Sequence, residues 1–222
     1  MRYLVRGLEI RSENAAKPTS TPSQWLLDCI ADFSPNWRVL DLGCGKLRYT
    51  VPLARHVKAV VAVDSREQID RNQTVNGEAD TSVREFVASR FDNVRVFALH
   101  EKGWRRWRYD RILIAFVLSA IPVPAVRLDV LRTARDLLKL RDGKVLVAAT
   151  FANSRFKDWE RSARAEPYRD GYLIHGPSRT SFYGLIKQDK LRRYCREVGL
   201  AITHAGTVHG QTAYVVAGWP KE

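Results

Sequence analysis

The chain has few of the residues that build disulfide frameworks and metal clusters. Its 222 residues include three cysteines, and neither a Cys-x-x-Cys pair nor a His/Cys spacing typical of zinc occurs. No stretch approaches the roughly 18 uninterrupted apolar residues of a membrane-spanning helix, and the first residues lack the apolar run of a signal peptide. We therefore expect a soluble, cytoplasmic protein without a bound metal.

Repeats and low-complexity tracts are also missing, and nothing marks a second domain. A chain of 222 residues is long enough to bury the core of a single α/β domain. We expect one domain over residues 1–222. Its polar first segment, residues 1–23, is expected to form an N-terminal arm, because Pro18 and Pro22 prevent a helix there.

Positive charge is present in excess, with 37 Lys and Arg against 24 Asp and Glu and a formal net charge of +13. Such an excess favours an anionic partner, either nucleic acid or a phosphorylated small molecule. Solvated surface arginines explain it equally well, because no run of five or six like charges occurs. Arginines interleaved with Trp104 and Trp107 form either a stacking and phosphate-binding patch or a packed segment.

Apolar strands alternate with helical patterns along most of the chain. Four or more such alternations predict a doubly wound, mainly parallel sheet with helices on both faces, followed by an antiparallel C-terminal strand. The expected strands are residues 38–42, 59–63, 94–99, 111–117 and 144–150, with a terminal hairpin of 200–205 and 212–217. The expected helices are residues 25–33, 49–56, 66–76, 82–89, 124–140 and 187–198.

The most informative motif lies where the first of these strands ends. The strand runs into Gly43-Cys44-Gly45, a turn where backbone can approach a ligand closely, and the second strand ends on Asp64. Asp64 follows Gly45 by 64 − 45 = 19 residues, close to the interval of roughly 20 expected for a ribose-binding carboxylate. The third glycine of the dinucleotide fingerprint is missing, which argues against NAD and FAD. Asp41 would be costly to bury without hydrogen-bond donors or a charged ligand.

These residues resemble the class I S-adenosylmethionine-dependent methyltransferases. Residues 39–48, VLDLGCGKLR, are similar to the first motif of that family, and Asp64 is similar to the acid of its second. Residues 109–122 resemble the fourth strand and the turn after it, and residues 137–147 resemble the helix, glycine turn and fifth strand. The resemblance covers about residues 25–150 in the order of the family, and it implies S-adenosyl-L-methionine as the cofactor.

The resemblance also implies roles for particular residues. Gly43, Cys44 and Gly45 would approach the methionine part of the cofactor, Asp41 would fix that turn, and Asp64 would bind the ribose. Ser65 would line the adenine side, where His100 stands in place of the acid or amide that family members often carry. The expected cofactor residues are Asp41, Gly43, Cys44, Gly45, Asp64, Ser65, Leu99, His100, Ala115 and Phe116.

The acceptor site is less clearly marked. Ser119 follows the fourth strand, where relatives place substrate-contacting residues, and residues 153–184 form a long aromatic segment after the fifth strand, which we expect to cover the substrate. The candidate catalytic residues are His175, Tyr172, Tyr183 and Ser119. An Asn/Asp-Pro-Pro-aromatic motif, a Pro-Cys nucleophile and acidic metal ligands are all missing after the fourth strand. Their absence argues against three subclasses of the family.

The sequence therefore predicts an enzyme that transfers a methyl group by in-line displacement. The acceptor stays open between an anionic molecule, with nucleic acid favoured by the charge, and a small molecule handled by a merely basic protein. A non-catalytic binding subunit with the same fold is a further alternative, disfavoured by the intact Asp41, Gly43, Gly45 and Asp64.

Overall fold

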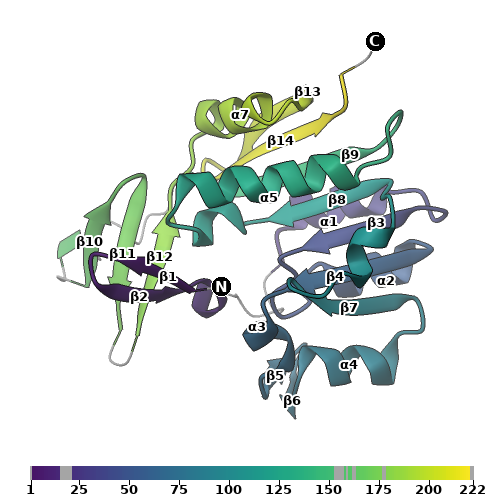
Figure 1. Ribbon diagram of the computed structural model, residues 1–222, viewed down its shortest axis with the longest axis horizontal. Coiled ribbons are helices and arrows are strands. Elements are labelled where there is room, and N and C mark those ends of the chain that lie inside the picture. The colour runs from purple at the N-terminus through teal and green to yellow at the C-terminus, as the bar shows by residue number, and fades with distance from the viewer. Residues whose placement is uncertain are drawn as a thin grey trace. The chain divides into compact units, whose positions relative to one another are not determined.

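The computed structural model describes residues 2–15, 22–152, 158, 160–161, 164–176 and 179–220. These residues fall into two compact units, whose elements are labelled in Figure 1. The first unit combines Met1–Ala15, Ile114–Asp136 and Val145–Glu222, and the second combines Ala16–Leu113 and Leu137–Lys144.

The second unit is built on parallel strands, as the sequence predicts. Their side chains are apolar on both faces, which is typical of strands covered by helices on either side. Strand β3 (Arg38–Leu42) pairs in parallel with β4 (Ala59–Asp64) and with the start of β8 (Arg111–Ala115), and β4 pairs with β7 (Val94–Ala98). The helices of this unit are α1 (Gln24–Ala31), α2 (Thr50–His56), α3 (Arg66–Asp70) and α4 (Val83–Arg90), with a 3-10 turn, η2, over Gly103–Arg106.

The prediction of a helix over residues 66–76 is correct for residues 66–70 and wrong for the rest. Helix α3 ends at Asp70, and a small hairpin of β5 (Gln73–Val75) and β6 (Glu78–Thr81) follows. Asn76 and Gly77 between these strands both have positive φ, at 48° and 89°, which suits a tight two-residue hairpin turn. Helix α4 then packs on β7 and α3 (Figure 1).

The first unit contains the rest of the main sheet. After β8 come a 3-10 turn, η3 (Leu118–Ala120), helix α5 (Pro124–Leu137) and strand β9 (Lys144–Thr150). Helix α7 (Gln188–Glu197) packs on the antiparallel hairpin of β13 (Ala201–Val208) and β14 (Thr212–Gly218). The strand order is β13-β14-β9-β8-β3-β4-β7, so the predicted mainly parallel sheet with an antiparallel C-terminal strand is confirmed.

A second sheet in the first unit has no counterpart in the sequence-based expectations. Its order is β1-β2-β12-β11-β10, and it joins two distant parts of the chain. Strands β1 (Arg2–Val5) and β2 (Leu8–Arg11), with η1 (Ser12–Ala15), come from the expected N-terminal arm. Strands β10 (Ala165–Tyr168), β11 (Gly171–His175) and β12 (Thr180–Gly184) come from the expected cover segment.

The N-terminal segment is therefore not a purely polar arm over the residues that the structure describes. Tyr3, Val5 and Ile10 are buried on one face of the second sheet, together with Leu173 and Phe182. Burial of these side chains fastens the N-terminal hairpin to strands nearly the whole chain length away. Residues 16–21, and residues 153–157, 159, 162–163 and 177–178 of the cover segment, lie outside the described part.

Candidate cofactor site

The glycine turn after β3 is fastened to the neighbouring strand. The backbone N–H groups of Gly43 and Cys44 both donate to the carbonyl oxygen of Val63, at 2.7 and 3.1 Å. Gly43 and Gly45 have φ of 87° and 56°, in the left-handed region that glycine adopts without steric cost. The turn is thereby held open at the carboxyl end of the strands, where ligands of such sheets bind.

Asp64 meets this turn as the sequence spacing predicts. One carboxylate oxygen accepts a hydrogen bond from the Gly45 N–H at 2.8 Å, and the other accepts from the Ser65 N–H at 2.7 Å. Gly43, Gly45 and Asp64 are part-exposed, whereas their chain neighbours Leu42, Cys44, Val63 and Ser65 are buried. A ligand can therefore reach a carboxylate whose orientation is fixed by two backbone N–H groups, and carboxylate oxygens can accept hydrogen bonds from vicinal hydroxyls.

Asp41 lies beneath the turn and is 2 % exposed. Its carboxylate accepts a hydrogen bond from the Thr50 hydroxyl at 2.6 Å. Burial raises the pKa of Asp41 to about 7; the Thr50 hydrogen bond lowers it and the negative charge of Asp64 raises it further. The side chain supports the turn from within and gives the site a second ionisable carboxyl group next to the part-exposed one.

Gln68 is a site residue that sequence reasoning missed. It is fully buried in α3, and its side-chain N–H donates to the Gly45 carbonyl at 3.0 Å. Its side-chain oxygen accepts from Arg71 at 2.7 Å, and its backbone carbonyl accepts from the Gln73 amide at 2.7 Å. Gln73 in turn accepts from Gln68 and Arg71 at 3.2 and 3.1 Å. This closed ring links the glycine turn to the β5–β6 hairpin.

The remaining predicted residues of the second unit lie after β4 and β7. Ser65 is buried and caps α3, accepting from the Gln68 N–H at 3.3 Å. The Leu99 N–H donates to the backbone carbonyl of Asp64 at 2.8 Å, and the side chain of His100 is exposed. Glu101 does not replace the acid that the family often places here, because its carboxylate is turned back to the Ala98 N–H at 2.8 Å.

Ala115 and Phe116 belong to the first unit and are part-exposed. The expected strand over 111–117 ends early, because Phe116 has φ of 64° and the 3-10 turn η3 follows. The Phe116 N–H donates to the Ala148 carbonyl of β9 at 2.7 Å. A bulky residue in the left-handed region is strained, and such strain is concentrated at functional positions.

Two of the candidate catalytic residues meet at Thr150, the last residue of β9. The buried Ser119 hydroxyl accepts a hydrogen bond from the Thr150 N–H at 3.0 Å, and the Thr150 hydroxyl lies 3.5 Å from the Tyr183 hydroxyl. Ser119 thus has a structural partner at this position. Tyr183 is part-exposed and remains a candidate for acceptor contact.

Tyr172 and His175 do not join one another, because they lie on opposite faces of β11. Tyr172 is paired across the strands with Tyr183, whereas His175 is paired with Thr180, on the face that carries the buried Leu173. The hydrogen bond from Tyr172 to the Glu160 carboxylate raises the pKa of the tyrosine. His175 lies 3.3 Å from the Thr180 hydroxyl and 3.4 Å from Glu166.

All three cysteines are poor nucleophiles. Burial raises the pKa of Cys44 within the turn, and it raises the pKa of Cys195 to about 12. Burial also raises the pKa of the half-buried Cys29. The thiols therefore stay protonated near neutral pH, and a thiolate is the reactive form of cysteine.

Membrane-spanning helices and metal-binding clusters are both absent from the described ranges. None of the helices they contain is long and apolar enough to span a membrane. Within the same ranges, no cluster of three or more His, Cys, Asp and Glu side chains that could hold a metal ion occurs.

A methyltransferase domain family matches residues 11–205, nearly the whole chain, so the protein belongs to that family. The uncharacterized protein YmfD of Escherichia coli is 33 % identical over 98 % of this chain and 96 % of its own length. The 23S rRNA (uracil(1939)-C(5))-methyltransferase RlmD of Psychromonas ingrahamii is 27 % identical over 61 % of this chain, but the match spans only 32 % of RlmD.

Solved structures support the same fold. Protein PH0226 of Pyrococcus horikoshii superimposes with a TM-score of 0.70 at 15 % identity, over 93 % of this chain and 95 % of that one. The 1,6-didemethyltoxoflavin-N1-methyltransferase of Burkholderia thailandensis, solved with its substrate and S-adenosylhomocysteine, gives a TM-score of 0.56 at 18 % identity. The coverage is 82 % of this chain and 70 % of that one. The protein thus has the Rossmann-like fold of class I methyltransferases.

Proposed function

We propose that the protein transfers a methyl group from S-adenosyl-L-methionine to an anionic acceptor, with nucleic acid as the favoured class. The observation that carries the cofactor assignment is the hydrogen bond of 2.8 Å between the Gly45 N–H and the Asp64 carboxylate. It brings the glycine turn and the ribose-binding acid together at the carboxyl edge of the sheet. Membership of the methyltransferase domain family supports the reaction.

The transfer is direct, from the sulfonium to the acceptor atom. In-line displacement needs the acceptor held close to the methyl carbon and in line with the leaving sulfur, so most of the catalytic effect comes from positioning. A cysteine-linked intermediate, the alternative route to carbon atoms of pyrimidine rings, is disfavoured because burial raises the pKa of Cys29, Cys44 and Cys195. We therefore propose a nitrogen or oxygen acceptor atom.

Two observations support nucleic acid as the acceptor class. The net charge of +13 favours a polyanion, and RlmD, a relative over 61 % of this chain, is named for methylating ribosomal RNA. The second candidate is a small molecule, favoured by the neighbour from Burkholderia thailandensis that was solved with 1,6-didemethyltoxoflavin.

Acceptor contacts are proposed for the first unit. Tyr183 and Ser119 are joined through Thr150 at the carboxyl end of β9, so we propose that this end of the strand contacts the acceptor. We further propose that residues 153–184 cover the substrate, with Tyr172 on the same face of the second sheet as Tyr183. His175, on the other face, is the weaker candidate for a base.

Two measurements test the proposal. Calorimetric titration should show S-adenosylmethionine and S-adenosylhomocysteine binding more tightly than NAD; tighter NAD binding would overturn the cofactor assignment. Incorporation of tritiated methyl groups should then be followed in total RNA, total DNA and a metabolite extract from cells lacking the gene. Label in the metabolite fraction alone would select the small-molecule candidate, and cofactor binding without any label would indicate a binding subunit.

A further inference from the structure

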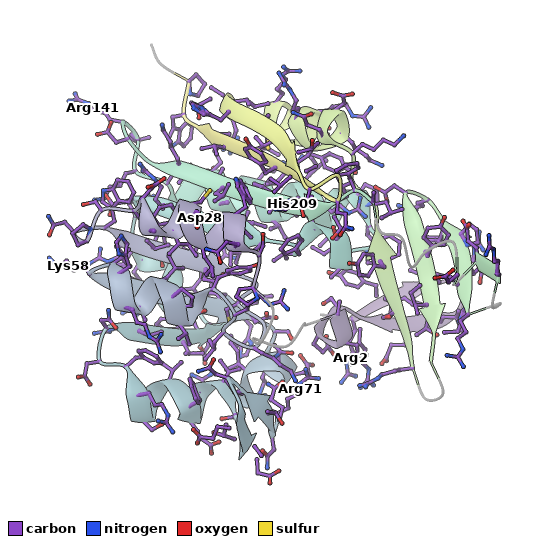
Figure 2. The ribbon with its side chains drawn as sticks, turned by 180° about the vertical axis from the view of Figure 1, so that it is seen from behind. Arg2, Asp28, Lys58, Arg71, Arg141 and His209 are labelled. Atoms are coloured by element: carbon purple, nitrogen blue, oxygen red, sulfur yellow. The ribbon has the colours of Figure 1, made fainter. Side chains whose placement is uncertain are left out.

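The amino ends of the parallel strands in the second unit carry exposed basic side chains. These ends lie at the edge opposite the glycine turn, because parallel strands all run in one direction. Figure 2 shows Lys58, just before β4, and Arg141, just before β9, projecting outward at the same end of this unit. We define the amino-edge surface by the exposed Lys58, Arg95, Arg108 and Arg141, which lie at or just before the starts of strands, together with the exposed Arg105 and Arg106 of η2 in the connection that leads to β8.

The cations of the amino-edge surface have no carboxylate partner among the described residues. None of its six members forms an ion pair with another described residue. Within the described part of the chain, some arginines elsewhere are neutralised, as in Arg84 with Asp70 and Glu101, and Arg90 with Glu78, whereas others, such as those of α7, are not. The carboxylate of Asp110 at this edge is itself held by Lys139 at 2.6 Å. The positive potential of the six side chains is therefore available to a ligand.

Tryptophans organise the guanidinium groups at this edge. Trp107 is half-buried, and the guanidinium carbons of Arg38 and Arg95 lie 5.8 and 5.7 Å from its ring centroid. Arg105 lies 4.3 Å from the ring of Trp104, which is completely buried. Of the two alternatives that the sequence left open, a stacking patch or a packed segment, Trp104 therefore takes the packed one. The rings hold arginines in place, and fixed arginines lose less side-chain entropy on binding.

We propose that the amino-edge surface binds the phosphodiester backbone of a nucleic acid. Arginine presents a planar fork of donors that matches phosphate oxygens, and unpaired arginines at one edge can follow a chain of phosphates. This inference rests on the proposed function in one respect: it takes the bound nucleic acid to be the methyl acceptor. Because β3 has five residues, roughly 16 Å separates this edge from the glycine turn. The surface therefore holds the polymer without touching the reacting atoms.

The decisive variant replaces Arg105, Arg106 and Arg108 by alanine. The probe is a 20-nucleotide single-stranded RNA and a DNA of the same sequence, with binding measured between 50 and 200 mM salt. Loss of three phosphate contacts should lower the log–log salt slope by about 2. Fourfold more salt would then weaken the wild type about 20-fold more than the variant. With an unmethylated RNA that the wild type methylates as acceptor, the variant's KM for the RNA should rise while its kcat stays unchanged.

A matched control removes the same charge elsewhere. Arg192, Arg193 and Arg196 lie on α7, also without an ion-pair partner among the described residues, and their replacement by alanine lowers the net charge equally. A charge-neutral variant, Trp107→Leu, releases Arg38 and Arg95 and should weaken binding although no charge is lost. Unchanged melting temperature and S-adenosylhomocysteine affinity show that each variant is folded.

The outcomes separate this inference from the proposed function. A lower slope for the amino-edge variant but not for the α7 variant supports the surface, with RNA and DNA arms telling which polymer binds more tightly. Equal slopes for the two variants, or RNA binding that neither changes, would overturn it. If the wild type methylates RNA and the amino-edge variant binds RNA with the same salt slope as the wild type, the proposed function would hold but the amino-edge surface would not be the binding surface. Binding at the surface with no methylation of nucleic acid would refute the acceptor class alone.

Discussion

Replacing Arg127 by methionine tests how the first unit holds its two sheets together. Arg127 is completely buried in α5, and its guanidinium donates to both carboxylate oxygens of Asp170, at 2.5 and 3.0 Å. It also donates to the Ile121 carbonyl at 2.8 Å. Asp170 lies in the turn between β10 and β11, so this pair connects the second sheet to the loop that carries η3.

The expected loss of stability can be worked out from these contacts. Breaking a buried ion pair by removing one partner costs about 3–5 kcal/mol, because the other charge is left uncompensated. Lys190 remains 2.8 Å from Asp170, which moves the value toward the lower end, whereas the Ile121 carbonyl loses its donor. The methionine side chain retains part of the apolar packing. We expect Arg127→Met to lower the free energy of unfolding by about 3 kcal/mol.

Urea denaturation at pH 7 measures this loss, with Arg132→Met as the control. Arg132 lies on the same helix, but its pair with Asp129 is exposed, so the control should cost no more than about 1 kcal/mol. Combining Arg127→Met with Asp170→Asn should recover part of the loss, because the lone buried charge is removed. If Arg127→Met cost no more than Arg132→Met, the pair would not hold the sheets together.

A pH series adds an independent check. Burial alone would raise the pKa of Asp170, but hydrogen bonds from Arg127 and Lys190 outweigh it and hold the pKa below its ordinary value. The stabilisation is therefore fully present above the ordinary carboxyl pKa and is lost as the pH falls through the lowered one. The difference between wild type and Arg127→Met should accordingly shrink below about pH 4. A difference that stays constant into acid would contradict the ion pair as its cause.

Three further predictions concern the cofactor site. Asp64→Ala should weaken S-adenosylhomocysteine binding at least tenfold in calorimetry, because hydrogen bonds to a charged acceptor contribute about 1.5–3 kcal/mol each; unchanged affinity would mean that the ribose is held elsewhere. Burial raises the pKa of Asp41 from 3.8 to about 7. Between about pH 4 and pH 7, therefore, the folded protein keeps a proton on Asp41 that the unfolded chain has already lost. Wild-type stability should therefore fall as pH rises from about 4 to 7, by up to about 4 kcal/mol, and Asp41→Asn should remove that dependence; parallel profiles would refute it. Gln68→Glu places a hydrogen-bond acceptor against the Gly45 carbonyl and should weaken cofactor binding about tenfold. Gln73→Ala, on the far side of the hydrogen-bonded ring formed by Gln68, Arg71 and Gln73, should have a smaller effect. A larger effect of Gln73→Ala would refute the role of Gln68.

The main sheet could be predicted because its strands are buried on both faces. Apolar runs such as residues 38–42 and 59–63 permit no competing amphipathic pattern, and the observed strands begin at the expected residues. The β5–β6 hairpin was missed although Asn76-Gly77 is a strong turn signal, because the polar residues around it also fit an exposed helix. The turn at Arg6-Gly7, with φ of 49° and 77°, has the same geometry without the asparagine that usually marks it.

In the candidate site, too, one contact could be predicted from the sequence and one grouping of residues was wrong. Gly45 and Asp64 were predicted to meet because neighbouring parallel strands end at the same edge, and the structure joins them by a hydrogen bond. Tyr172 and His175 were grouped because both lie in one aromatic segment. Their separation by three residues places them on opposite faces once the segment is recognised as a strand, since side chains alternate with period two.

The hydrogen bonds around Asp64 explain why the cofactor half of the protein can be identified without a ligand. Its carboxylate is already oriented by the N–H groups of Gly45 and Ser65, and Gln68 holds the Gly45 carbonyl from the other side. A turn fixed by its own backbone needs little reorganisation on binding, so a ribose bound as we propose would meet a carboxylate that is already in place. The proposed acceptor residues lack such a local signature, because Ser119 and Tyr183 are brought together through Thr150, a residue whose role depends on the tertiary fold.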